Sequence, residues 1–353
     1  GGDAAVLALA GRSRVPAGDG GRGAAARGAA LKAGERVLVT GGAGFIGSSV
    51  VRALQAAGLR AEVLDDLSAG RKEWLPEGVG LVEADVRNAS AVSAAAEGAA
   101  AVVHLAAMSR VLPSVQSGAA GVRGVLDANV LGTASALQAA AGSATVRRFL
   151  YAGSSTYYGS QALPNSEADP FVPSSPYALS KYDGELLVTQ FAREYGLPAA
   201  TLRLFQVYGG VRQHSAGPLA TVEAAFVRAA AQGLPLLLEG SGEQSRDFVH
   251  VEDVADAFVK ALTVPDAGGR LLGGGAINVG SGCTRTIASV AAALGQQARL
   301  SRRPPRRMDL NATCADTCRA RRRLGWAPAV GFAEALRADA AAASVPGFLQ
   351  EPS

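Results

Sequence analysis

The sequence contains little cysteine, histidine, aromatic residue or charge. Of its 353 residues, 3 are cysteine, 3 are histidine, 5% are aromatic and 18% are charged. Three cysteines cannot build a disulfide framework, which favours a reducing compartment, and the spacing of cysteine and histidine predicts no metal site. The basic residues do not gather on one aromatic-rich element, so the net charge of +4 does not indicate a nucleic-acid surface. Because no apolar run approaches the ~20 residues of a membrane-spanning helix, we expect no contact with a membrane.

The first 33 residues are rich in alanine, glycine and arginine and poor in acidic residues. Such a segment buries too little apolar surface to become ordered, so residues 1–33 are predicted to be a disordered tail. The same composition permits an organelle transit segment. We therefore expect a cytoplasmic protein, with a plastid as the alternative location.

Strands and helices alternate along the next part of the chain. Strands are predicted at residues 36–40, 61–65, 80–84, 101–105, 148–151 and 198–203, and the first helix at about 44–57. Nearly continuous apolar strands between helices indicate a buried parallel sheet, so the fold class is α/β, a doubly wound sheet of the Rossmann type. Residues 34–208, joined by 250–262, are predicted to form this domain. Residues 209–249 and 263–353 are predicted to form a smaller C-terminal lobe that binds the substrate at the carboxyl edge of the sheet.

A glycine-rich loop follows the first predicted strand. Gly41, Gly44 and Gly47 lie between that strand and a helix, where glycines permit a tight turn and a helix N-terminus can hold a pyrophosphate. Asp65 ends the second strand about 20 positions later and is placed to bind the adenosine ribose hydroxyls, with Asp66 as the weaker candidate. Since a carboxylate repels a 2′-phosphate, the pattern favours NAD over NADP. Residues 85–86 follow the third strand and are placed to flank the adenine.

A tyrosine and a lysine stand one helical turn apart at Tyr177 and Lys181. Residues at i and i+4 share a helix face, and a nearby cation favours the phenolate, so Lys181 is expected to lower the pKa of Tyr177 and make it a proton acceptor. Ser154 follows another strand, at the same edge of the sheet. Its hydroxyl is placed to pass a proton between a substrate hydroxyl and the tyrosine.

With these motifs in place, the chain resembles the extended short-chain dehydrogenase/reductase family and, within it, nucleotide-sugar 4-epimerases of the UDP-glucose 4-epimerase type. The matching motifs span almost everything after residue 35, at residues 41–47, 63–70, 103–107, 129–133, 175–181, 202–209, 246–254 and 324–328. The resemblance implies transient oxidation at C4 of the sugar, with NAD as a resident cofactor, a UDP-hexose as substrate and a homodimer as the assembly.

The resemblance also implies a role for each matching residue. Tyr177 would be the acid/base, Lys181 would hold the nicotinamide ribose, and Ser154 would be the hydroxyl partner. The implied cofactor ligands are Gly41, Gly44, Phe45, Ile46, Gly47, Asp65, Asp66, Ser68, Gly70, Asp85, Val86, Leu105, Ala106, Ala107, Tyr177 and Lys181. The implied substrate ligands are Ser154, Ser155, Tyr177, Gln206, Arg246 and Arg306, the two arginines for the diphosphate.

Several residues depart from the family pattern or bear on related activities. Gln206 replaces a usual asparagine at the diphosphate, and Met308 replaces a usual glycine in the loop of Arg306. Ser155 and Thr156 stand where related 4,6-dehydratases carry an Asp-Glu pair and decarboxylases a glutamate, which counts against both. UDP-glucuronate 4-epimerase or decarboxylase activity remains the alternative within the family. A non-catalytic dinucleotide-binding protein is the alternative from another class, although such relatives typically lose the tyrosine or the lysine.

Overall fold

The computed structural model describes residues 28–109, 115, 118–210, 221–266, 271–295, 300–304 and 311–344. The first half of the chain forms β1 (Arg36–Thr40), α2 (Phe45–Ala56), β2 (Arg60–Asp65), η2 (Lys72–Trp74), β3 (Gly80–Glu83), α3 (Ala89–Ala96), β4 (Ala101–His104), α5 (Gly118–Leu126), the π-helix η3 (Asp127–Leu131), α6 (Gly132–Gly142), β5 (Arg148–Ser154) and η4 (Ser155–Tyr158). Each predicted strand of this half is present, the fifth longer by three residues than expected.

The second half forms α7 (Pro176–Glu194), β6 (Ala199–Leu204), β7 (Gln206–Tyr208), α8 (Val222–Ala231), β8 (Leu236–Glu239), β9 (Ser245–His250), α9 (Val251–Thr263), β10 (Gly273–Val279), β11 (Thr284–Thr286), α10 (Ile287–Ala293), β12 (Leu300–Arg303), α11 (Cys318–Leu324) and α12 (Phe332–Ala343). In the part of the chain that the structure describes, no helix is long and apolar enough to cross a membrane.

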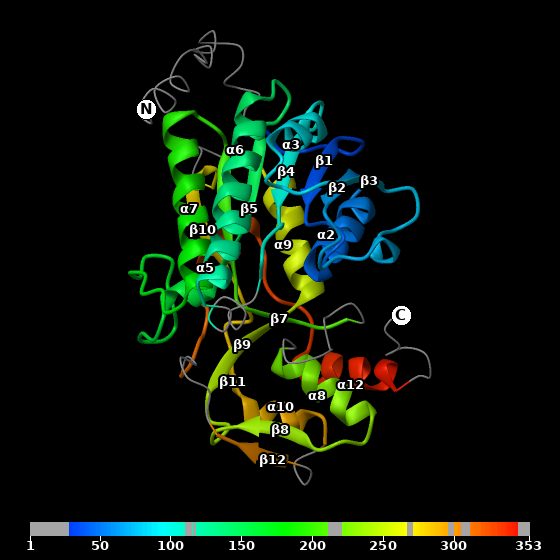
Figure 1. Ribbon diagram of the computed structural model, residues 1–353, viewed down its shortest axis with the longest axis vertical. Coiled ribbons are helices and arrows are strands. Elements are labelled where there is room, and N and C mark those ends of the chain that lie inside the picture. Colours follow the sequence, from blue (N-terminus) through cyan, green and yellow to red (C-terminus); the bar gives the residue numbers. More distant parts are fainter. Residues whose placement is uncertain are drawn as a thin grey trace.

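Seven parallel strands form the central sheet, in the order β10-β6-β5-β4-β1-β2-β3. The order reverses between β1 and β4, which is the doubly wound arrangement and confirms the predicted fold class. Helices cover both faces: α2 and α9 lie on one, and α3, α6 and α7 on the other (Figure 1). Ligands of such sheets bind outside the carboxyl ends of the strands at the reversal point, so the site is expected there.

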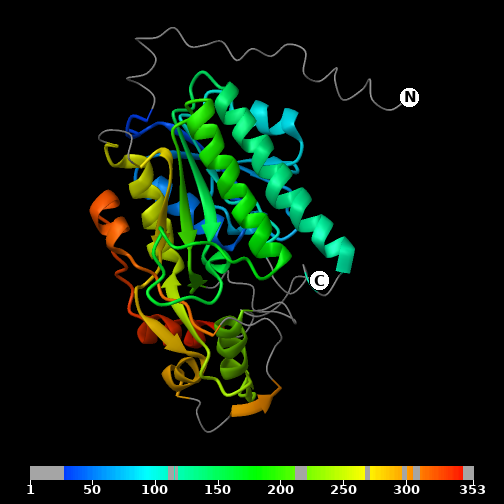
Figure 2. The ribbon, with the colours of Figure 1, turned by 90° about the vertical axis from the view of Figure 1, so that its left-hand side faces the viewer.

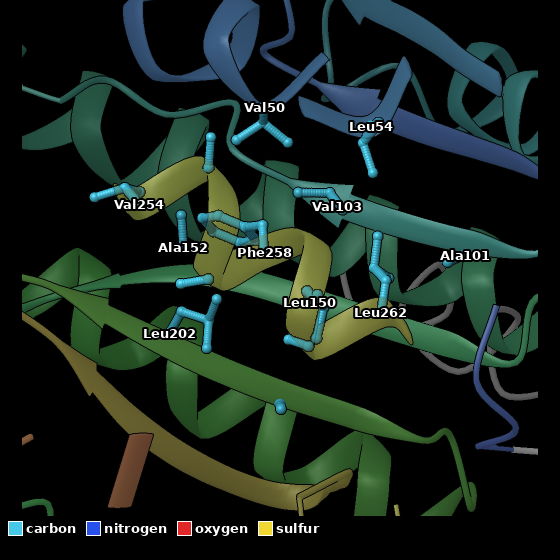
Figure 3. Close-up of a cluster of buried hydrophobic side chains, with 14 of the residues drawn as sticks. Val50, Leu54, Ala101, Val103, Leu150, Ala152, Leu202, Val254, Phe258 and Leu262 are labelled. Atoms are coloured by element: carbon cyan, nitrogen blue, oxygen red, sulfur yellow. The ribbon is translucent and has the colours of Figure 1, made fainter. Parts of the chain in front are cut away.

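A dry apolar layer fixes α2 and α9 to the sheet. Val50 and Leu54 of α2 face Phe258 and Leu262 of α9, with Val103 and other strand side chains between them (Figure 3). All of these side chains are fully buried. Burial of one such side chain stabilises a fold by about 1.5–3 kcal/mol, so this layer holds the glycine-rich loop at the start of α2 in a fixed position.

A smaller lobe lies beyond the carboxyl edge of the sheet, at the bottom of Figure 1. It contains a three-stranded sheet, β11-β9-β7, a two-stranded sheet, β12-β8, and the helices α8, α10 and α12. Tyr208, Phe248 and Phe332 pack edge-on or tilted at its centre. The lobe is also seen below the large sheet when the molecule is turned by 90° (Figure 2). One strand that was predicted for the lobe lies elsewhere.

That strand is β10, whose residues the sequence analysis assigned to the lobe. It instead pairs with β6 and forms one edge of the seven-stranded sheet. The prediction failed because β10 opens with Gly273, Gly274 and Gly275, which carry no strand pattern. Its pairing with β6 is a long-range contact that local patterning does not reveal.

The last residues of the predicted disordered tail, 28–33, have a defined structure, so the prediction is wrong for them. Residues 1–27 lie outside the described part of the chain, but residues 28–33 are packed against the sheet domain. Leu31 is buried, and the fully buried Arg148 donates to the carbonyl oxygens of Gly28, Ala29, Ala261 and Val264. This anchor has no signal in the sequence, because an arginine inside a predicted strand does not indicate which carbonyl groups it will satisfy.

Candidate active site

The glycine-rich loop forms a cradle in which Gly41 and Gly47 leave no room for a side chain. Gly41 has a φ of +71°, and a Cβ atom there would lie 2.6 Å from the backbone nitrogen of Ala106. A side chain at Gly47 would overlap the carbonyl oxygen of Gly41. The N-cap of α2 is Gly44, which has no side chain that could accept a hydrogen bond from the N–H groups of the first turn. A cradle of this kind suits the pyrophosphate of a dinucleotide.

Asp65 joins the second strand to this cradle. Its carboxylate is 7% exposed and accepts hydrogen bonds of 2.9 Å from the backbone N–H groups of Ala43 and Leu67. Burial raises the pKa of Asp65, while the N–H groups of Leu67 and Ala43 oppose that rise. Since each carboxylate oxygen has two lone pairs, both retain one for the hydroxyl group of a ribose.

The segment after Asp65 folds closely over the cradle. A Cβ atom at Gly70 would lie 2.9 Å from Oδ1 of Asp65, so this position also admits only glycine without a shift. Asp66 accepts from the backbone N–H and the hydroxyl of Ser68, at 3.0 and 2.6 Å. Asp66 therefore caps its own turn, and Asp65 is the carboxylate that faces the cradle.

The remaining predicted cofactor residues lie after β3 and β4. Asp85 accepts from the Arg87 guanidinium, whose Nε lies 2.9 Å from both carboxylate oxygens, and this hydrogen bond lowers the pKa of Asp85. Val86 is buried against Gly132 of α6. Residues 105–107 continue from β4 beside the cradle, where Leu105 donates to the carbonyl oxygen of Thr40.

Tyr177 and Ser154 meet at the carboxyl edge of the sheet. Ser154 is the last residue of β5, and Tyr177 is the second residue of α7, whose N-cap Ser175 accepts from Ala178 at 3.1 Å. Burial raises the pKa of Tyr177, and a hydrogen bond with Ser154 partly lowers it. The prediction that Lys181 lowers the pKa of Tyr177 is therefore wrong for the protein on its own.

Lys181 is itself deeply buried and does not offset the rise in the pKa of Tyr177. The lysine is 4% exposed, and burial lowers its pKa to about 7, so its charge is partly lost at neutral pH. Its Nζ lies 4.3 Å from the centre of the Tyr151 ring, whose electron-rich face attracts a cation. Tyr177 and Lys181 thus share a helix face, as predicted, but burial dominates the electrostatics of both.

Two buried polar side chains connect these elements and were given no role in the sequence analysis. Asn129 accepts from the backbone N–H of Met108 at 2.7 Å and donates to the hydroxyl of Ser180 at 2.9 Å, so it joins the loop after β4 to α7. His104 lies between the hydroxyls of Thr40 and Thr133, at 2.7 and 2.9 Å. Burial lowers the pKa of His104 to about 3, and therefore the ring is neutral.

The predicted substrate residues lie toward the lobe. Ser155 is buried in η4, directly after Ser154. The amide of Gln206 donates to both carboxylate oxygens of Glu223 of α8, at 3.0 and 3.3 Å, and Glu223 is only 1% exposed. The Arg246 guanidinium donates to the Ser245 carbonyl oxygen at 2.7 Å.

Gln206 lies opposite Phe248 in the β7–β9 pair, so Gln206 and Arg246 lie on one face of the small sheet. Arg306 and Met308 lie outside the described residues. Among the residues that the structure describes, no cluster of three or more His, Cys, Asp or Glu side chains could hold a metal ion.

Comparison with known proteins identifies the same fold and motifs. The model of the "NAD dependent epimerase/dehydratase family" matches residues 37–280. A UDP-glucose 4-epimerase of Mycolicibacterium smegmatis is 39% identical over 315 residues, which cover 85% of this chain and 96% of that protein.

Two solved structures are similar over nearly their whole length. The UDP-glucose 4-epimerase of Thermotoga maritima with UDP-glucose has 30% identity and a TM-score of 0.78, over 87% of this chain and 97% of that one. The Thermus thermophilus enzyme in complex with NAD has 34% identity and a TM-score of 0.76, over 87% and 98% of the two chains.

Proposed function

Because the chain belongs to the NAD dependent epimerase/dehydratase family, we propose that it is a nucleotide-sugar 4-epimerase that uses NAD as a resident cofactor. The substrate that we propose is a UDP-hexose, either the UDP-glucose/UDP-galactose pair or a UDP-N-acetylhexosamine. The observation that carries the proposal is the hydrogen bond between Ser154 and Tyr177 beside a buried Lys181, next to a glycine cradle that fits a dinucleotide.

Tyr177 is the proposed acid/base of the reaction. It would take the proton of the sugar C4 hydroxyl and later return it, while NAD, when bound, supplies the acceptor and donor of the C4 hydride. Ser154 would orient the C4 hydroxyl and pass the proton, since its own hydroxyl also lies 2.9 Å from that of Thr156. A catalytic pKa near the working pH is needed for efficient transfer, so the burial that raises the pKa of Tyr177 must be offset by positive charge close to the phenol.

Lys181 is the proposed source of part of that charge. Burial causes the low pKa of Lys181, and no nearby carboxylate opposes it. An anionic or hydroxyl-rich ligand beside the ammonium would raise this pKa and keep the lysine charged. Its position on the same face of α7 as Tyr177 supports the second proposed role, holding the nicotinamide ribose.

The residues at the start of η4 favour epimerisation over the alternatives. Elimination of water from C6 requires an acid and a base, and related enzymes supply carboxylates there, whereas Ser155 and Thr156 occupy those places here. With hydroxyl groups only, oxidation at C4 and return of the hydride remain as the favoured chemistry. UDP-glucuronate 4-epimerase is the second candidate, because Arg212, which lies outside the described residues, or another basic residue of the lobe could pair with a 6-carboxylate.

The proposed assembly is a homodimer that forms through the helices α5 and α7. Leu179 and Leu186 of α7 are 45% and 48% exposed, and they stand seven positions apart, so they lie on one face of the helix. Leu131 at the end of η3 is 56% exposed. Large apolar side chains grouped in this way are typical of a contact surface between subunits.

Incubation with three nucleotide sugars tests the proposed activity. The purified protein is given UDP-glucose, UDP-N-acetylglucosamine or UDP-glucuronate, and the products are separated by anion-exchange chromatography. We expect the 4-epimer of one neutral sugar, and a kcat at least about 100-fold lower for Tyr177→Phe. Tyr195→Phe, at a half-exposed position at the end of α7, is the control. If no sugar is epimerised and denaturation releases no NAD, the proposed function is wrong.

A further inference from the structure

Two cysteines that are far apart in the sequence lie in segments that touch. Cys283 lies between β10 and β11, and Cys314 lies between β12 and α11. The fully buried carboxylate of Asp247 joins the two segments, because its Oδ2 accepts at 2.9 Å from the N–H of Gly282 and at 2.9 Å from the N–H of Ala315. Each donor belongs to a residue adjacent to one of the cysteines, and two donors to one oxygen lie within about 6 Å of each other.

A second contact brings the same segments together at Gly280, two residues before Gly282. A Cβ atom at Gly280 would lie 2.6 Å from the Cβ of Ala315, so only glycine lets the backbones approach this closely. A Cβ atom at Gly282 would also lie in ordinary contact with the backbone of Ala315, at 3.7 Å from its carbonyl oxygen. The segment of residues 280–282 and the segment around Ala315 are therefore in direct contact.

The sulfur of Cys314 lies beside the peptide bond that follows Cys283. The backbone N–H of Thr284 donates a hydrogen bond to the Cys314 thiol. That nitrogen is bonded to the carbonyl carbon of Cys283, so the Cα of Cys283 lies only about 2.4 Å from it. The Cys314 sulfur consequently lies beside the peptide group that joins Cys283 to Thr284. A disulfide needs Cα atoms about 4.4–6.8 Å apart, a separation that two segments in direct contact can reach.

We propose that Cys283 and Cys314 form a reversible disulfide, and that this pair is a site of oxidative modification. The oxidant that we name is a low-molecular-weight disulfide such as glutathione disulfide. The exposed Cys283 thiolate attacks one of its sulfurs, which forms a mixed disulfide and releases one glutathione thiolate. The Cys314 thiolate then attacks the Cys283 sulfur, and the second glutathione leaves. The two protons of the protein thiols end on the two glutathione molecules.

The surroundings of the two thiols set the order of these steps. Burial raises the pKa of Cys314, and the negative charges of Asp247 and of the Cys283 thiolate raise it further. Cys314 is partly buried, whereas Cys283 is exposed. Cys283 is therefore the thiol that meets the oxidant, and closure of the disulfide by Cys314 becomes faster as the pH rises above neutrality.

The position of the pair suggests what its oxidation changes. Asp247 follows Arg246 in β9, and β11, which begins directly after Cys283, pairs with β9 so that Thr284 lies opposite Asp247 and Arg285 opposite Arg246. A disulfide would fix both segments that Asp247 holds by hydrogen bonds and would prevent the strand that carries Arg246 from adjusting to a bound diphosphate. Since Arg246 is a proposed diphosphate ligand, the expected effect, which rests on the proposed function, is weaker binding of the nucleotide sugar.

A peptide map decides whether the disulfide forms. The full chain is incubated with glutathione disulfide at pH 8, digested without reductant and analysed by mass spectrometry. We expect a peptide pair linked through Cys283 and Cys314, a fall in titratable thiols from 3 to one, and full reversal by dithiothreitol. Cys318→Ser is the matched control, since Cys318 is exposed and its backbone N–H, which the variant keeps, donates to Asp316; this variant must still form the link. A link that includes Cys318, or three titratable thiols after oxidation, would overturn the proposal.

Kinetics then test the consequence for binding. Cys283→Ser and Cys314→Ser each remove the link, so glutathione disulfide should leave their KM for the nucleotide sugar unchanged. For the unchanged chain and for Cys318→Ser, we expect oxidation to raise KM about tenfold, the loss of roughly one charge-assisted contact. An unchanged KM in a fully linked protein would refute the effect on Arg246. The peptide map needs no activity, so its outcome is independent of whether the protein is an epimerase.

Discussion

The Nζ of Lys181 lies 4.3 Å from the centre of the Tyr151 ring, and the hydroxyl of the same tyrosine donates to the Lys181 carbonyl oxygen at 3.2 Å. One aromatic side chain of β5 therefore holds both the head and the backbone of a lysine in α7. Burial lowers the pKa of this lysine to about 7, far from the value of about 10.4 that it has in an unfolded chain. The stability of the protein must depend on pH as a result.

We expect Lys181→Met to stabilise the NAD-depleted protein most at pH 6.5 and less at pH 9. Below pH 7 the folded protein must bury the charged ammonium of Lys181, so the substitution removes the full free-energy cost of burying that charge. Between about pH 7 and 10 the unfolded chain binds a proton that the folded chain lacks, so the stability of the unchanged protein rises with pH. The advantage of the variant should fall by about 2 kcal/mol between the two pH values. Urea unfolding of both proteins at both pH values, followed by circular dichroism, measures this difference in the free energy of unfolding.

An exposed lysine supplies the control for this experiment. Lys72 of η2 lies at the surface, and Lys72→Met should change stability by the same small amount at both pH values. If the advantage of Lys181→Met were independent of pH, the lysine would be charged in the folded protein over the whole range. The low pKa of Lys181 would then be wrong.

The glycine cradle gives a prediction about the cofactor. In Gly47→Ala the new methyl group would overlap the carbonyl oxygen of Gly41, which would close the cradle or push α2 away from it. We expect purified Gly47→Ala to release at most about one tenth of the NAD that the unchanged protein releases on denaturation, measured by chromatography.

Gly80→Ala is the matched control for the cradle. Gly80 lies at the start of β3, where the nearest atom to a new Cβ would be the Glu62 side chain at 3.5 Å, an ordinary contact. This variant should keep its NAD. Retention of NAD by Gly47→Ala as well would mean that the cradle does not hold the dinucleotide.

Local patterns were enough to predict most of the sheet domain. Short apolar runs between helices predict strands within one residue at most positions, because parallel strands are buried on both faces and leave little ambiguity. Glycines at Gly41 and Gly47 indicate a cradle because no other residue fits a tight turn at a helix start. The features that failed depend on tertiary contacts: the pairing of β10 with β6, the anchoring of residues 28–33 by Arg148, and the electrostatics of Tyr177.

The pKa of Tyr177 illustrates why a motif cannot give the electrostatics of a site. The spacing of Tyr177 and Lys181 predicts that they share a helix face, and it contains no information about how much water reaches either group. In the folded protein, burial raises the pKa of the phenol and lowers that of the ammonium. The stacking of Lys181 on Tyr151 involves a residue 30 positions away and has no signature in sequence.

The exposed leucines of α7 allow a test of the homodimer. We expect a dimer in light scattering, and we expect Leu186→Glu to shift it toward monomer, because a carboxylate in an apolar contact loses its hydration. Leu234→Glu is the control, since Leu234 is 51% exposed and lies in the lobe, between α8 and β8. A monomer for the unchanged chain, or equal effects of the two substitutions, would argue against an interface on α7.

A buried ion pair connects α7 to the strand behind the site and to η4. Nη2 of Arg203 lies 2.6 Å from Oε1 of Glu185, and Nη1 donates to the hydroxyl of Tyr158 at 2.6 Å. The Tyr157 hydroxyl donates to Oε2 of the same glutamate. The side chains of the pair are 4% and 7% exposed. Because Glu185 lies one turn after Lys181 and the two tyrosines belong to η4, this cluster fixes the distance between α7 and the loop that follows Ser154.

Removal of one partner of this pair should cost more than removal of both charges. Arg203→Met leaves Glu185 charged and buried, and we expect a loss of about 3–5 kcal/mol in the free energy of unfolding, together with a lower kcat as η4 shifts. The double variant Arg203→Met/Glu185→Gln removes that charge and keeps an acceptor for the Tyr157 hydroxyl, so it should recover a large part of the loss in urea unfolding. Lys260→Met breaks an exposed pair with Asp256, 2.8 Å apart, and should cost under about 0.5 kcal/mol. Equal losses in the single and double Arg203 variants would show that the cost comes from lost packing, because an unpaired carboxylate exists only in the single variant.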